Sequence, residues 1–222
     1  TPAEEIRSML KLSLASHMAL RPSFFARSSV PLPASYLKLL KWNSTTIDGA
    51  DEPRVLIPVA AKWRFLVLGE HEAIPVDWFD LSFEDEGWLA GSGSLGFGDE
   101  DLATDVRKAA GKPSLPASVC FRHKFRVEEF DADQALLLRL RCDDGAVVYL
   151  NGREVLRQNL PRGILTPKTR ASRAVSSLEE REIHDFLVPP GILVKGENLL
   201  ATQAFQHTTA SSDLVFSLTL HN

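Results

Sequence analysis

The sequence predicts an all-β fold, an antiparallel sandwich of two sheets, with an N-terminal helical extension. From about residue 58 onward, apolar residues recur at every second position in several short segments, which is the period of a half-buried strand. Connections rich in Gly or Pro separate these segments, and no helical pattern lies between them. This combination is typical of a sandwich and not of an α/β fold.

The first 21 residues predict the helix. Thr1 and Glu4 have the spacing of a capping box, and Pro2 stands at the first helical position. Apolar residues then recur at helical spacing, namely Ile6, Met9, Leu10, Leu14 and Met18. A stretch rich in Pro and polar residues follows. We therefore expect residues 1–57 to form a helix and a connecting segment, and residues 58–222 to form the sandwich.

The alternation of apolar residues predicts the individual strands of the sandwich. In residues 119–127 the odd positions are apolar or His, whereas the even positions hold Cys120, Arg122 and further basic residues. We expect one face of this strand, the apolar one, to be buried. Asn151-Gly152 predicts a type I′ turn that joins two strands. The remaining strands are expected at residues 62–68, 136–142, 183–187, 199–205 and 214–220.

Charge and hydropathy exclude two classes of protein. The net charge of −4 and the pI near 5.9 argue against a protein that binds nucleic acid, because such a protein needs a concentrated cationic surface. No apolar run is long enough to cross a bilayer, and residues 1–5 lack the pattern of a signal peptide. We therefore expect neither a nucleic-acid partner nor a membrane span.

No motif predicts catalysis or a cofactor. Gly91, Gly93 and Gly96 match a dinucleotide-binding pattern, but acidic residues and no helix follow, so a loop with positive φ angles is the preferred interpretation. The histidines are scattered and no nucleophile motif occurs, so we expect no catalytic residues. Cys120 and Cys142 lie on faces of opposite character, which predicts free thiols, with Cys142 buried.

Carboxylates gather in two places. Asp99 and Asp101 belong to an acidic loop that either is solvated or holds a structural calcium ion through its oxygens. Asp143 and Asp144 are adjacent, and adjacent strand residues point to opposite faces, so they cannot act as a glycosidase pair. We expect them to shape the turn before Gly145 by bonding backbone amides.

Several short sequence segments, taken together, resemble a known family. These are Trp63, Asp77-Trp78, Glu86 to Gly91, Leu95 to Gly98, Phe121 to Phe125, Asp143 to Val155, Gly196 to Ala201 and Ser211 to Leu214. They resemble galactose-binding-like jelly-roll modules appended to bacterial secreted enzymes. The stretch from Asp143 to Val155 is also similar to the sugar-binding domain of β-galactosidase-type glycoside hydrolases.

The resemblance implies a galactose-binding-like jelly roll, with Gly145, Asn151 and Gly152 at hairpins and Asp213 capping a loop. It also implies a non-catalytic carbohydrate-binding module, extracellular or periplasmic, accessory to a secreted hydrolase. The partners would be an oligosaccharide or polysaccharide and a neighbouring catalytic domain. The alternative is a structural module that only packs against that domain.

If the module has a ligand, we expect its site at three residues in loops. These are Trp78, which we expect to be exposed while Trp63 and Trp88 are core, together with Arg157 and Asn159. An exposed aromatic ring beside polar side chains would suit a sugar, whereas a dry apolar patch would suit packing.

Overall fold

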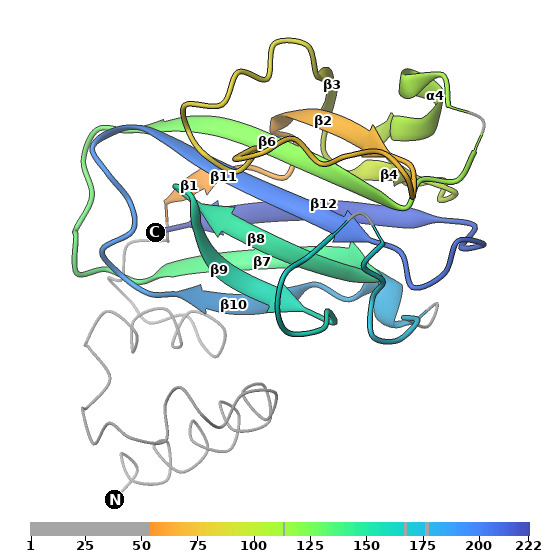
Figure 1. Cartoon of the computed structure of the whole chain (residues 1–222). Coiled ribbons are helices and arrows are strands. Elements are labelled where there is room, and N and C mark those ends of the chain that lie inside the picture. The colour runs from red at the N-terminus through yellow and green to blue at the C-terminus, as the bar shows by residue number, and fades with distance from the viewer. Residues whose placement is uncertain (1–53, 113, 167, 176–177) are drawn as a thin grey trace, which may run out of the picture. The chain divides into compact units, whose positions relative to one another are not determined.

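A computed structural model of the chain describes residues 54–112, 114–166, 168–175 and 178–222. The helix predicted at residues 1–21 lies outside the described residues, as does most of the connecting segment. In the described part almost all regular structure is strand, and the strands form two sheets (Figure 1). The prediction of a two-sheet β-sandwich is therefore confirmed.

The first sheet follows the order β10-β7-β12-β4-β5, and β1 also pairs with β12. Its strands are β1 (Val55–Ile57), β4 (Leu95–Phe97), β5 (Thr104–Asp105), β7 (Leu136–Asp143), β10 (His184–Val188) and β12 (Leu214–His221). All of its paired strands are antiparallel except β4 and β5, which are parallel.

The second sheet is antiparallel throughout and follows the order β3-β2-β6-β11-β8-β9. Its strands are β2 (Lys62–Leu68), β3 (Leu89–Ser92), β6 (Ser118–Val127), β8 (Gly145–Leu150), β9 (Arg153–Gln158) and β11 (Gly196–Phe205). A short helix, α4 (Val106–Ala110), and a 3-10 turn, η1 (Glu179–Arg181), complete the described elements. No helix in the described ranges is long and apolar enough to cross a membrane.

The core lies between the two sheets and consists of the apolar residues that the alternation predicts. Strand β6 contributes its odd positions other than His123, β7 its even positions, and β12 the residues Leu214, Phe216, Leu218 and Leu220. Phe121 of one sheet stacks on Phe216 of the other, with ring centroids 4.2 Å apart. Burial of this continuous apolar surface is the main force that holds the sheets together.

Strand β1 lies on the N-terminal side of the boundary expected between residues 57 and 58. Its Ile57 is fully buried in the core, and Arg54 and Asn222 exchange backbone hydrogen bonds. Asn222, which follows β12, is therefore paired with Arg54, which precedes β1.

The glycine-rich stretch is not the loop with positive φ angles that the sequence predicts. Gly91 lies in β3, Gly96 lies in β4, and the chain passes from the second sheet to the first between them. Glycine is required there by close approach, because a Cβ on Gly96 would lie 1.8 Å from the Leu214 carbonyl oxygen. A Cβ on Gly93 would similarly lie 2.5 Å from the Val59 carbonyl oxygen.

The hairpin between β8 and β9 turns as predicted. Asn151 and Gly152 have φ angles of 51° and 79°, the positive values that a type I′ turn requires. Asn151 also bonds beyond the turn, since its Oδ1 accepts from the Leu199 amide and its Nδ2 donates to Asn198 and Ile192. The turn is therefore anchored to the neighbouring strand β11.

Candidate functional site

A segment of residues 69–88 covers the outer face of the second sheet (Figure 1). The expectation that only the apolar face of residues 119–127 is buried is wrong for this reason: Cys120 is fully buried and Arg122 is 1% exposed. Trp78 and Trp88 of the segment pack against Leu68, Cys120, Leu199 and Ala201 of the sheet. They form a second, smaller apolar cluster outside the main core.

Arg122 holds the covering segment on the sheet. Its Nε donates to the Asp85 carboxylate at 2.7 Å, and its guanidinium lies 5.1 Å from the centre of the Phe83 ring. Its Nη atoms donate to three backbone carbonyls of the segment, those of Trp78, Asp80 and Phe83. The buried cation is thus satisfied by five groups of one segment, as a buried charge must be.

An open depression of about 580 Å³ lies at the edge of this cluster, and we call it the aromatic depression. Phe79 and Tyr149 stack in its wall, with ring centroids 4.6 Å apart, and Trp78 meets both rings edge-on. Two aliphatic side chains of its lining are largely exposed, Val76 at 82% and Ile164 at 94%. The depression therefore combines aromatic surface with an apolar rim.

Two of the three predicted ligand residues line this depression. Trp78 is 4% exposed, so the expectation of an exposed ring is wrong: its ring is stacked on Trp88 at 6.3 Å and packs against the sheet. Arg157 also lines the depression, where its Nε and Nη2 donate to Glu154 and its Nη1 donates to the Pro161 and Gly163 carbonyls. Arg157 therefore shapes the loop that forms the wall.

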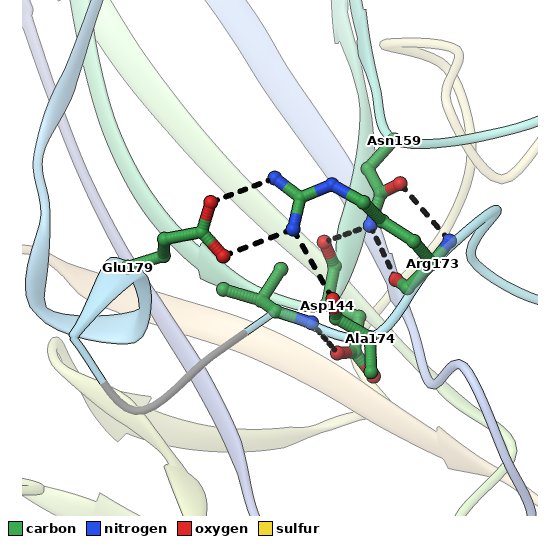
Figure 2. A network of polar contacts seen from close by, with 6 residues as sticks. Asp144, Asn159, Arg173, Ala174 and Glu179 are labelled. Carbon is green, nitrogen blue, oxygen red and sulfur yellow. Dashed lines mark hydrogen bonds and ion pairs between the residues drawn. The ribbon is translucent and has the colours of Figure 1, made fainter.

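Asn159 does not line the depression but belongs to a separate polar network (Figure 2). Its Nδ2 donates to the carbonyls of Asp144 and Arg173, and its Oδ1 accepts from the Arg173 amide. The Arg173 guanidinium forms a two-pronged ion pair with Glu179. Asn159, which follows β9, therefore has a structural role: it connects the junction between β7 and β8 with the segment that leads to η1.

Asp144 bonds backbone amides, but not those of the turn before Gly145. Its Oδ1 accepts from the Val175 amide at 2.8 Å and its Oδ2 from the His207 amide at 2.7 Å. Both amides are distant in sequence, so this buried carboxylate fastens two loops to the end of β7. Gly145 itself has no room for a side chain, since a Cβ there would lie 2.9 Å from the Asn159 carbonyl oxygen.

Asp143, in contrast, faces two other carboxylates. One oxygen each of Asp143, Glu180 and Asp213 lie within 4.8 Å of one another, and we call this group the carboxylate cluster. Burial, a side-chain hydrogen bond with Asp144 and the charges of Asp144, Asp213 and Glu180 together raise the pKa of Asp143 to about 9. Burial and the charge of Asp213 likewise raise the pKa of Glu180.

The acidic loop expected to be solvated or to hold calcium is engaged with an arginine. Arg141 donates to Asp101 at 2.7 Å and to Asp99 at 3.3 Å, and its Nε donates to the Glu180 carbonyl. These bonds lower the pKa of Asp101. The calcium expectation for Asp99 and Asp101 stays a prediction.

Both thiols are free and Cys142 is buried, as predicted, whereas Cys120 is buried against the expectation. Burial raises the pKa of both Cys120 and Cys142, so neither is a ready nucleophile at neutral pH. Sequence analysis missed three residues of these sites, Phe79, Tyr149 and Glu180. Tyr149 could have been found, because it points away from the core between Val148 and Leu150, whereas nothing in the sequence connects Glu180 with Asp143 or Asp213.

No family model matches this sequence, and no curated protein matches it. Solved structures similar to the chain include a Bifidobacterium dentium β-glucuronidase, with 20% identity over 71% of this chain and 21% of that one, at a TM-score of 0.43. Another is Bacteroides uniformis β-glucuronidase 2, with 13% identity over 77% and 18%, at a TM-score of 0.49. A third is an uncultured Clostridium β-glucuronidase, with 17% identity over 80% and 30%, at a TM-score of 0.45.

This chain therefore spans less than a third of the length of each of these glycoside hydrolases. At this level of similarity, what it binds has to be inferred from its own residues. Those residues define a two-sheet β-sandwich with an aromatic depression on one sheet and a carboxylate cluster at one end.

Proposed function

We propose that this chain is a non-catalytic, galactose-binding-like jelly-roll module that binds an oligosaccharide or polysaccharide in the aromatic depression. The observation that carries the proposal is the wall of Phe79 and Tyr149 beside Trp78. Aromatic faces suit the apolar side of a sugar ring, and a few polar groups then fix its hydroxyls. Asp77 and Arg157 are among the polar side chains of its lining.

The sequence resemblance supports the wider context. It implies that the module accompanies the catalytic domain of a secreted bacterial hydrolase, outside the cytoplasm. The absence of a predicted nucleophile, metal-ligand motif or glycosidase pair in the sequence is the reason for proposing no catalysis of its own. Turnover of a chromogenic glycoside that persists through repurification would contradict this part of the proposal.

The binding test is calorimetry of the full chain against a panel of glycans at high concentration. An open site replaces water hydrogen bonds with protein ones of similar strength, so we expect a Kd on the order of 0.1 to 1 mM. Tyr149→Ala should weaken binding by about tenfold or more, the equivalent of about 1.4 kcal/mol. Tyr149→Phe keeps the ring and should retain most of the affinity, and Leu178→Ala, exposed outside the depression, is the control.

A second candidate function rests on the exposed rim. Val76 and Ile164 would suit a dry contact with a neighbouring domain, and this is the structural-module alternative. No binding of any glycan, together with loss of attachment to the catalytic domain in Val76→Ser and Ile164→Ser, would favour it over the sugar site.

A further inference from the structure

Gln203 contributes a buried amide to the lining of the aromatic depression. In β11 it pairs with Cys120 of β6 on one side and with Val147 of β8 on the other, and directly paired residues share a face of the sheet. Cys120 belongs to the apolar cluster on the outer face, so the Gln203 side chain points to the face that carries the depression. It lines the depression although the residue is only 2% exposed.

One end of this amide is fixed and the other end is free. The Nε2 of Gln203 donates to the Oγ of Ser118 at 3.0 Å, and Ser118 is fully buried. Within the described ranges the Oε1 of Gln203 accepts no hydrogen bond, and unlike the Oε1 of Gln206 it is not enclosed by protein. A buried acceptor that stays unpaired is costly, so this oxygen suits a hydroxyl donor on a ligand.

The arginine of the lining has no donor directed to an anionic ligand. The nitrogens of Arg157 all donate within the protein, Nε and Nη2 to Glu154 and Nη1 to the carbonyls of Pro161 and Gly163. Its side chain is 10% exposed, and the Glu154 carboxylate balances its charge. A carboxylate or sulfate of a ligand would therefore have to displace Glu154 in order to pair with this arginine.

Asp77 is the other charged residue of the lining. It is exposed, and among the described residues no Lys, Arg or His forms an ion pair with its carboxylate. The exposed Arg162 and Lys168 belong to the neighbouring loop but not to the lining. An anionic ligand would thus meet a like charge without a compensating cation, and the lining disfavours uronic acids and sulfated sugars.

We propose that the aromatic depression selects an uncharged pyranose, one hydroxyl of which donates to the Oε1 of Gln203. This inference rests on the sugar site proposed above, and it names the class of sugar that the site takes. The wall of Phe79 and Tyr149 contacts the apolar face of the pyranose, and the amide bonds a hydroxyl at its edge. Because Ser118 already holds the amide, little side-chain freedom is lost on binding.

The first experiment compares sugars that differ only in charge. The methyl glycosides of glucose, galactose and mannose and the matching methyl uronides are titrated at high concentration into the full chain, at low ionic strength because salt screens the repulsion. At least one neutral glycoside should bind, and its uronide should bind about tenfold more weakly. Asp77→Asn should reduce this difference, whereas Glu84→Gln, exposed in the same covering segment but outside the lining, should retain it.

The second experiment tests the hydroxyl contact with the glycoside that binds best. Gln203→Met keeps an unbranched side chain but removes the amide, and it should weaken binding about tenfold. Gln206→Met, the same change at an equally buried glutamine outside the lining, should keep the affinity. Among the deoxy derivatives of the glycoside, one should bind the unaltered chain about tenfold more weakly yet bind Gln203→Met as well as the parent does, because the lost partners are the same pair.

Two results would overturn the inference and leave the sugar site intact. One is binding of the uronides as tight as that of the neutral glycosides. The other is a set of deoxy derivatives that all respond to Gln203→Met as the parent does, which would mean that the amide bonds no hydroxyl. Failure of every one of these glycosides to bind would also overturn it, and the glycan panel described above would then decide separately whether the sugar site exists.

Discussion

Arg122 offers the sharpest test of how the outer face of the second sheet is built. Replacing it with Met keeps an unbranched apolar side chain but removes the guanidinium. The Asp85 carboxylate, whose side chain is 12% exposed, then loses its ion-pair partner. Three backbone carbonyls of segment 69–88 lose their donors in the same change.

The expected loss of stability follows from what is left unpaired. Removing one partner of a buried ion pair destabilises a protein by about 3 to 5 kcal/mol, chiefly because the other charge remains buried. The unpaired carbonyls also destabilise the segment, but their contribution is small because water can reach them once the segment loosens. We expect Arg122→Met to lower the free energy of unfolding of the covering segment by about 3 to 5 kcal/mol.

The assay is urea unfolding followed by tryptophan fluorescence, since Trp78 and Trp88 belong to this segment and are buried against the sheet. In Arg122→Met their emission should shift to the red at lower urea than the loss of β-sheet circular dichroism. Arg126→Met is the matched control, four positions along the same strand and on the same face, because its pair with Glu128 is exposed. If the two variants unfolded at the same urea concentration, the inferred role of Arg122 would be wrong.

Three further predictions concern glycines and thiols. Gly96→Ala should prevent β4 from pairing with β12 and lower the melting temperature by many degrees. Gly87→Ala, with open space around the new Cβ, should leave the melting temperature unchanged. Equal melting temperatures for the two variants would contradict the close approach of Gly96 to Leu214. Gly152→Val should destabilise the fold by about 1 to 2 kcal/mol in thermal melts because Val resists a positive φ, although its Cβ would meet no clash. Cys120 and Cys142 should not react with a thiol reagent at pH 8 in the native state and should both react in guanidinium chloride, so rapid native labelling would refute their burial.

The sequence alone determined the parts of the fold that depend on local pattern. Alternation of apolar residues identified the inner faces of β6, β7 and β12, because a strand that buries one face must repeat every second residue. Asn151-Gly152 identified a turn, because both positions need positive φ angles. The sequence also predicted correctly that the two cysteines form no disulfide, because Cys120 lies on a strand face with basic residues and Cys142 on one with leucines.

Only the tertiary structure decided which outer surfaces are covered and which distant residues meet. Arg122 and Trp78 have the sequence context of exposed residues, yet both are buried, because segment 69–88 folds back over the second sheet. Asp143, Glu180 and Asp213 are separated by tens of residues, and the pairing of β7 with β12 brings two of them together. Local periodicity contains no information about such contacts, because they depend on sheet order and on the course of the loops, which are set by long-range packing.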